Sequence, residues 1–270
     1  RYGNLFAVGY SSSDTGISTP GGHQPNRSSA TTSFDGFLTA VDVRQPAGQK
    51  RLWGTYIGGT AIEQALSVAT DQVGISVYVA GQTSSTSGIS DVAAHQFPLG
   101  GAQDGFLMRF RPGGNRVWGT YLGGVSTDYP GDVVCHRNSL WWPVITNEGG
   151  MATPGALQAN PLNNFYTPLI NQFDTSGNLL YATYNGGPGH HFWPLSSASD
   201  QQNILYFGFQ ASYSGFPTRN AHQANFGGTV GSGQFDALVM QWIDQQSQPP
   251  LINPVLANPL ITKPSCGNPN

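Results

Sequence analysis

The sequence has little charge, few cysteines and no long apolar run. Only 9% of its 270 residues are Asp, Glu, Lys or Arg, against about 25% in average globular domains. The 11 basic residues are scattered and the formal net charge is −3, so no stripe of positive charge exists to neutralise phosphates. No apolar stretch approaches the roughly 18 residues of a membrane-spanning helix. These shortages argue against nucleic acid as a partner, against a membrane span and against a cytosolic helical enzyme.

The two cysteines, Cys135 and Cys266, do not form a metal-binding spacing. In an oxidising compartment they could pair and pin the C-terminal region, and otherwise they remain two free thiols. The first residues, RYGNLFAVGYSSS, lack the charged, apolar and small-residue regions of a signal peptide. We therefore expect any export signal to lie outside this sequence.

Glycine (36 residues) and proline (19 residues) are abundant, and aromatic residues make up 11% of the chain. Valine, isoleucine, leucine and phenylalanine recur in short blocks, which supply material for a core and argue against a disordered chain. Many short strands joined by polar, glycine-rich turns fit this composition. We expect one large all-β domain, because such domains are common at this length.

A six-residue string occurs three times and organises the chain. GTYLGG occupies 119–124, GTYIGG lies 65 residues earlier at 54–59, and ATYNGG lies 63 residues later at 182–187. Strings that recur at a nearly constant step indicate a repeat architecture. In the second repeat, four short segments rich in β-branched and aromatic residues predict four strands. These segments are 65–70, 77–83, 104–110 and 117–124.

The long loop before the third strand of each repeat carries a phrase that ends in glutamine. It reads PGGHQ at 20–24, AAHQ at 93–96, PGALQ at 154–158 and NAHQ at 220–223. The third strand that follows each phrase starts at the same position of the repeat. The residues at these two phases are His23, His95 and His222 in the loops, and Asp35, Asp104 and Asp236 at the strand starts, with Thr167 as the exception. Because these residues recur from repeat to repeat, we interpret them as structural rather than catalytic or metal-binding.

Four-stranded units repeated about every 60 residues are typical of β-propeller blades. The VYVAGQTSST block at 77–86, the PGALQ phrase, the DGF strand start at 104–106 and the GTYLGG string resemble the SBBP repeat, a β-propeller repeat of secreted and surface-attached bacterial proteins. The resemblance covers Asn4 to about Asp244 in four copies. It implies an all-β fold, a β-propeller of four-stranded blades, in a secreted or cell-surface bacterial protein. We expect neither a cofactor nor a bound metal.

About fourteen strands are expected, because the chain opens on a second strand at 5–10 and closes on a third strand at 236–242. Glycine suits the crowded centre of a propeller, so we place GTYLGG as the innermost strand of each blade. The chain then holds half a blade followed by three complete blades. Because a closed ring needs four to eight blades, we expect either the C-terminal part of a larger propeller or another chain that supplies the missing blades.

The third repeat departs most from the pattern. It has LWWPVITNEGG in place of VYVAGQTSST, and Pro168 falls inside its third strand, which predicts irregular or edge strands there. After the repeats at 1–244, closely spaced prolines predict an extended tail at 245–270. The tail is either a linker to a further domain or a clamp across the open side of the propeller.

Aromatic residues and two adjacent histidines form the candidate ligand site. His190 and His191 precede Trp193, and the pair Trp141 and Trp142 lies in the third repeat. Exposed rings of this kind can stack on sugar faces, and the alternative interpretation places them in the core between blades. No carboxylate adjoins the two histidines in the sequence, so they have no partner for acid–base or metal chemistry.

No nucleophile elbow, phosphate-binding glycine loop or buried pair of carboxylates can be picked out of the sequence. The sequence therefore predicts a non-catalytic extracellular β-propeller that serves as a scaffold or binding module, for example as a subunit of a larger surface assembly. The alternatives are a carbohydrate-active propeller enzyme or glycan-binding module, and a structural coat or filament subunit. The expected partners are other protein chains, further domains of the same protein, or a glycan.

Overall fold

The computed structural model consists of β-strands, turns and loops throughout the residues that it describes. These residues are 3–28, 33–162, 164–187, 191–200, 204–211, 227 and 236–243, with only the backbone described at 191–195 and 243. The all-β expectation is confirmed. None of the described residues belongs to a helix that could cross a membrane. The predicted tail at 245–270 lies outside the described residues.

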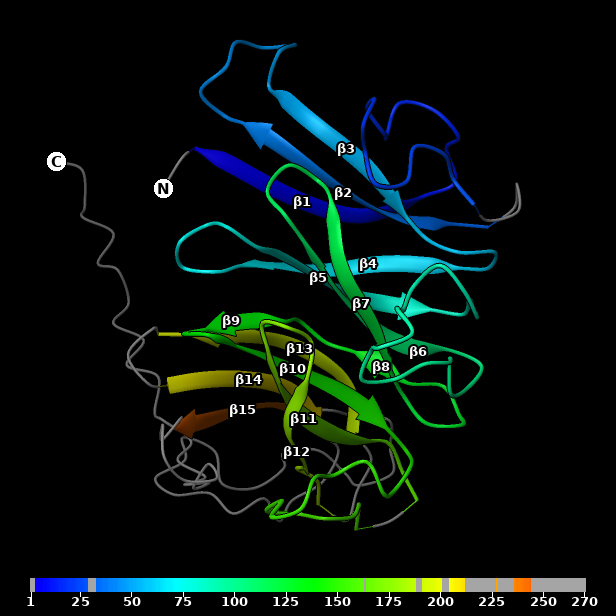
Figure 1. Ribbon diagram of the computed structural model, residues 1–270. Helices are drawn as coiled ribbons and strands as arrows, with labels where there is room; N and C mark the ends of the chain where they lie inside the picture. The colour runs from blue at the N-terminus through cyan, green and yellow to red at the C-terminus, as the bar shows by residue number, and fades with distance from the viewer. Residues whose placement is uncertain are drawn as a thin grey trace, which may run out of the picture.

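The strands form four antiparallel sheets that follow one another along the chain (Figure 1). The first sheet has the order β1-β2-β3, the second β4-β5-β6-β7, the third β12-β11-β10-β8 with β9 also paired to β10, and the fourth β13-β14-β15. Each sheet is an open path of strands, so no closed sheet occurs among the described residues. The strands are β1 Asn4–Ser11, β2 Asp35–Asp42, β3 Arg51–Ile57, β4 Glu63–Thr70, β5 Val77–Thr83, β6 Asp104–Phe110, β7 Arg116–Leu122, β8 Tyr129–Pro130, β9 Val134–His136, β10 Ser139–Thr146, β11 Thr167–Asp174, β12 Leu179–Tyr184, β13 His191–Ser199, β14 Ile204–Ala211 and β15 Asp236–Ile243.

The second sheet consists of the four segments predicted for the second repeat. Strands β5 and β6 have the predicted bounds, whereas β4 begins at Glu63 and β7 spans Arg116–Leu122. The turns between β4 and β5 and between β6 and β7 contain Gly74 and Gly114, which have φ angles of 74° and 89°. Glycine adopts this left-handed conformation without a steric penalty, so these positions keep the hairpins tight.

The predicted blade phase is wrong. With GTYLGG as the innermost strand, each predicted blade starts with this string. However, β3 and β7, which contain it, are the last strands of their sheets and pair with the preceding strands β2 and β6. The four sheets have three, four, five and three strands, instead of half a blade and three complete blades. The glycine in these strands makes room for the preceding loop, whose N–H groups at Thr19 and Asp91 donate to the carbonyls of Gly54 (2.9 Å) and Gly119 (3.1 Å).

Of the two alternatives predicted for the third repeat, irregular strands or edge strands, the structure shows irregular strands, and the strand that contains Pro168 is not at an edge. Strand β11 lies between β10 and β12, and Pro168 stands opposite Ile145 of β10. Near the start of the strand its missing N–H does no harm, and its carbonyl accepts a hydrogen bond from the Asn185 N–H at 2.9 Å. The irregularity of the third repeat falls instead on its first strand, which is divided into the short strands β8 and β9.

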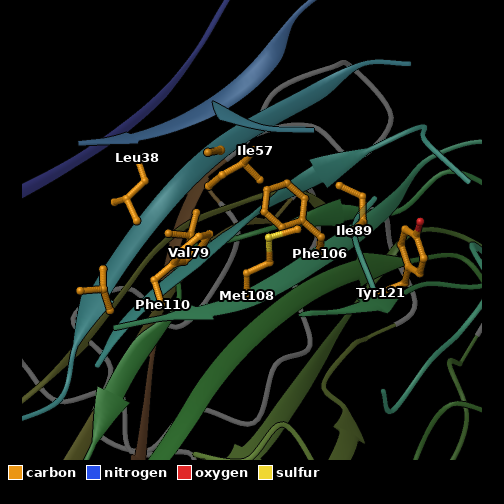
Figure 2. Packing of buried hydrophobic residues seen from close by; sticks show 10 residues of the cluster. Leu38, Ile57, Val79, Ile89, Phe106, Met108, Phe110 and Tyr121 are labelled. Atoms are coloured by element: carbon orange, nitrogen blue, oxygen red, sulfur yellow. The ribbon is translucent and has the colours of Figure 1, made fainter. Parts of the chain in front are cut away.

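Hydrophobic cores lie between successive sheets. The first core joins the first and second sheets, as the side chains in Figure 2 show. The second core joins the second and third sheets, and the third core joins the third and fourth. Representative buried residues are Leu38, Val79, Phe106 and Met108 in the first core, Tyr78, Leu107, Trp142 and Phe173 in the second, and Trp141, Ile170, Phe207 and Trp242 in the third.

Replacing Gly119 with alanine is expected to destabilise the fold by roughly 1–3 kcal/mol, the usual cost of overpacking. A Cβ atom at this position would lie closer than 3.0 Å to the carbonyl oxygen of Ile89, which belongs to the loop backbone and has little freedom to move. The third repeat carries Ala182 at the same place, which makes Ala182→Gly the matched control, with an expected cost of about 0.5–1 kcal/mol. Urea unfolding of both variants tests this, and a smaller loss for Gly119→Ala than for the control would contradict it.

Candidate functional site

In the three described loops, the glutamine of the repeated phrase bonds the long loop to the last strand of the same sheet. The backbone N–H of the glutamine donates to the threonine hydroxyl of the GTY string, and its side-chain oxygen accepts from the first glycine of the GG pair. The copies are Gln24 with Thr55 (2.8 Å) and Gly58 (3.0 Å), Gln96 with Thr120 (3.0 Å) and Gly123 (3.0 Å), and Gln158 with Thr183 (3.0 Å) and Gly186 (3.1 Å). The repeated phrase is therefore a structural cross-link.

The tyrosine of the same string makes a second repeated bond. Its hydroxyl donates to the backbone carbonyl of a residue that lies just after β1, β5 or β10 in the three sheets. The pairs are Tyr56 with Ser13 (2.7 Å), Tyr121 with Ser85 (2.8 Å) and Tyr184 with Glu148 (2.6 Å). Burial raises the pKa of Tyr121 to about 12, and the nearby carboxyls of Glu63 and Asp104 act in the same direction. This tyrosine therefore remains a hydrogen-bond donor throughout the physiological pH range.

Two tryptophans that the sequence analysis missed join neighbouring sheets. The indole N–H of Trp53 donates to the carbonyl of Pro112 (2.8 Å), and that of Trp118 donates to the carbonyl of Thr175 (3.0 Å). Both acceptors lie in the hairpin turn of the next sheet. The signal was present in the sequence, because a tryptophan directly precedes Gly-Thr-Tyr in both repeats.

The loop histidines also pack on the next sheet. The ring of His23 meets Phe110 of β6 edge-on at 5.9 Å, and the ring of His95 meets Phe173 of β11 in the same way at 5.6 Å. Burial lowers the pKa of both histidines, so both are neutral at physiological pH. These contacts agree with the structural interpretation of His23 and His95, whereas His222 lies outside the described residues.

The aspartates at the starts of the third strands accept hydrogen bonds from their own loops. Asp104 accepts from the Gln96 side chain (3.1 Å) and from the backbone N–H groups of Gly100 (2.7 Å) and Gly101 (3.1 Å). Asp35 accepts from the Gln24 side chain at 3.0 Å in the first sheet. Asp236 accepts from the N–H of Gly227 at 2.7 Å. In each case the carboxyl group is hydrogen-bonded to the loop that precedes its strand.

A second carboxyl group lies beside the GG pair in the first two repeats. Glu63 accepts from the N–H of Gly59 (2.8 Å), and Asp128 accepts from the N–H of Gly124 (2.8 Å). We call each GG pair with its two carboxyl groups a glycine corner. The first corner consists of Gly58, Gly59, Asp35 and Glu63, and the second of Gly123, Gly124, Asp104 and Asp128.

The glycine corners are packed too closely for any side chain on the first glycine. A Cβ atom at Gly58 would come within 2.7 Å of both the Asp35 and Glu63 carboxyl groups. At Gly123 it would come within 2.5 Å of both Asp104 and Asp128. The second acid lies four residues after the second glycine in both repeats, a sequence signal that was overlooked. The third repeat has His191 at the position of the second acid and Thr167 at the position of the aspartate.

The second glycine corner has the most perturbed titratable group. Burial raises the pKa of Asp128 to about 7, and the neighbouring Asp104 and Glu148 act in the same direction, while bonds from Thr146 and Gly124 partly oppose the rise. The Oδ1 atom of Asp128 is buried and accepts no hydrogen bond. A neutral, protonated carboxyl is the form that such an environment favours. Burial also raises the pKa values of Asp104 and Glu63.

A carboxyl group with a pKa near 7 has the acidity that general acid–base catalysis requires. However, Asp128 and Asp104 are 0% exposed, so a substrate has no access to either of them. No group of three or more His, Cys, Asp or Glu side chains suited to a metal ion occurs in the part of the chain that the structure describes. The carboxyl groups of the glycine corners are therefore buried groups that bond to the backbone, as structural residues do.

The predicted aromatic ligand site is only partly within the described residues. Trp141 and Trp142 are 0% exposed; Trp142 donates to the carbonyl of Gly131 (3.1 Å) and Trp141 packs on Trp242. Their burial fits the core interpretation and leaves no ring face for a ligand. His190 lies outside the described residues, and for His191 and Trp193, which belong to β13, only the backbone is described.

Cys135 and His136 both belong to β9, one of the two pieces of the first strand of the third sheet. Burial raises the pKa of Cys135 to about 11, which keeps its thiol protonated. Cys266, its suggested disulfide partner, lies outside the described residues. His136, which the sequence analysis did not single out, is buried and contacts the Ser199 hydroxyl through Nδ1 at 2.8 Å. This contact links β9 to β13 across two sheets.

Comparison with known proteins gives no family for the chain. No family model matches it, and no curated protein sequence matches it. Among solved structures, it is similar to a chain of Kuenenia stuttgartiensis hydrazine synthase, with a TM-score of 0.34 and 12% identity. The match covers 78% of this chain and 60% of that chain. A similarity at this level carries no argument about the activity of the present protein.

Proposed function

We propose that this protein is a non-catalytic β-propeller module of a secreted or cell-surface bacterial protein, and that it serves as a rigid scaffold for binding other proteins. The observation that carries this proposal is that the same polar side chains bond loops to strands in one repeat after another. The glutamine, threonine and tyrosine bonds recur in three sheets, and the buried carboxyl groups recur in two. Side chains committed to such bonds are not free to perform chemistry.

The packing order of the sheets supports the propeller architecture. Each sheet lies face to face on the next, and the first strands of three successive sheets lie against one another, β4 with β9 and β9 with β13. Adjacent first strands are expected where blades surround a common axis. A cryo-electron microscopy structure of the protein in its native assembly tests this architecture, because a propeller requires the sheets to be arranged radially in a closed ring.

The non-catalytic role is tested by incubating the protein with a panel of plant, fungal and bacterial polysaccharides and measuring newly formed reducing ends and unsaturated sugars. We expect no product above the buffer control. Product formation that is lost in both His191→Ala and Trp193→Ala would contradict the proposal and establish the carbohydrate-active alternative. Binding without product would identify a glycan-binding module.

A further inference from the structure

The second sheet has a face that is completely covered by the first. Alternate residues of β5 and β6 point toward the first sheet and form most of the first core. They are Val77, Val79, Phe106, Met108 and Phe110, all at most 1% exposed. The cross-sheet bonds of Trp53 and the ring contact of His23 border this face. Sheet-on-sheet burial of this kind is thus the repeating contact of the fold.

The equivalent face of the first sheet has no described strand packed on it. The strand registers of the two sheets show this equivalence. In the first sheet Leu5 pairs with Val41 and Gly9 with Phe37. In the second sheet the corresponding pairs are Val77 with Phe110 and Gly81 with Phe106. We call Leu5, Ala7, Phe37, Thr39 and Val41 the first open face. Leu5 is 54% exposed and the other four are half-buried. The first sheet lies at one end of the stack in Figure 1.

Gly48 gives independent evidence that this face lacks a neighbour. It lies in the β2–β3 turn with a φ of 86°, close to the values of Gly114 (89°) and Gly177 (91°) in the corresponding turns. The rings of Trp53 and Trp118 lie within about 3 Å of where a Cβ atom would stand on Gly114 and Gly177. At Gly48 there is nothing within 4 Å of that point.

No described sheet packs on the opposite face of the last sheet. In the second sheet, Tyr78 pairs with Arg109 and Ala80 with Leu107, and this face packs on the third sheet. The last sheet has the same register, with Tyr206 opposite Gln241 and Gly208 opposite Val239. We call Tyr206, Gly208, Val239 and Gln241 the second open face. Val239 is 51% exposed, whereas its counterpart Leu107 is fully buried.

We infer that the two open faces are the two halves of one interface, through which a second copy of this chain docks head to tail. Within the chain, successive sheets always pack in the same way. The face of one sheet that corresponds to the second open face packs on the face of the next sheet that corresponds to the first open face. A second copy can repeat that contact with its last sheet on the first sheet of its neighbour. Such a heterologous contact forms a ring if it closes and a filament if it does not.

This inference rests on the proposed scaffold role, and its failure leaves that role intact, because a monomeric module can still be a non-catalytic scaffold. Sedimentation velocity of the wild-type chain is expected to show dimers or longer assemblies. Leu5→Asp and Val239→Asp each place a carboxylate in one half of the interface, and each is expected to weaken association by about 100-fold or more. Val92→Asp, in a loop outside both faces and 88% exposed, is the matched control and should associate as the wild type does.

Mixing the two variants distinguishes a head-to-tail contact from a symmetric one. Leu5→Asp keeps an intact last sheet and Val239→Asp keeps an intact first sheet, so an equimolar mixture should form a one-to-one complex. A mixture that remains monomeric while the wild type assembles would overturn the inference. So would a wild-type chain that stays monomeric, or one whose Leu5 face gains hydrogen-exchange protection only when a different protein is added.

Discussion

Trp142→Ala is expected to lower the free energy of unfolding by about 3–5 kcal/mol, the range observed for large aromatic residues removed from cores. The indole is fully buried in the second core, against Gly105 of β6 and near Phe173 of β11. Its removal leaves a cavity between two sheets and deprives the Gly131 carbonyl of its hydrogen bond at 3.1 Å. The variant should therefore unfold at a lower denaturant concentration.

Chemical unfolding followed by circular dichroism measures this effect. Val125→Ala, at a residue that is 78% exposed, is the control and should change stability by no more than about 0.5 kcal/mol. The same experiment separates the two interpretations of the aromatic pair. A ligand platform would lose binding with little change in stability, so a loss below about 1 kcal/mol for Trp142→Ala would contradict the core assignment.

The second large effect is a fall in stability as the pH rises from about 4 to about 7. Burial raises the pKa of Asp128 from 3.8 to about 7 on folding, so the folded state holds this proton more tightly than the unfolded state. The resulting stability is fully present below about pH 4 and is lost as the pH rises through 7. At 1.36 kcal/mol per pKa unit, Asp128 alone contributes about 4 kcal/mol to this fall.

Asp128→Asn removes the titration and keeps a side-chain oxygen for the N–H of Gly124. We expect the variant to be more stable than the wild type at pH 8 and to show a flatter dependence of unfolding free energy on pH. Glu63→Gln, in the first glycine corner, should act in the same direction because burial raises that pKa as well. Parallel pH profiles for the wild type and Asp128→Asn would show that Asp128 is not protonated in the folded protein.

Much of the strand structure could be predicted from the sequence because its signals are local. Strands β5 and β6 have the predicted bounds, since β-branched and aromatic residues between glycine and aspartate mark strands without reference to the rest of the chain. The loop histidines and glutamines could be interpreted as structural because they recur at one repeat phase. Which strands pair with one another could not be predicted from local signals. A periodic sequence does not show where one sheet ends and the next begins, so GTYLGG could be either the first or the last strand of a sheet.

The candidate site was harder to predict because its parts come from different repeats. Asp104 belongs to the third strand of the second sheet, whereas Asp128 precedes the first strand of the third sheet. Only packing brings the two carboxyl groups to opposite sides of Gly123. Likewise, the run that contains Trp141 and Trp142 has the composition of either an exposed platform or a core strand. Its burial depends on the sheets that cover both faces of β10.

The sequence alone determined an all-β chain of repeated strands, with a glutamine phrase and a glycine-rich string in each repeat, because these features depend on local composition and spacing. The tertiary structure decided which strands share a sheet, which acids face each other across a glycine and which sheet faces are left uncovered. Those properties depend on contacts between residues far apart in the chain, and a periodic sequence offers several equivalent ways to make such contacts.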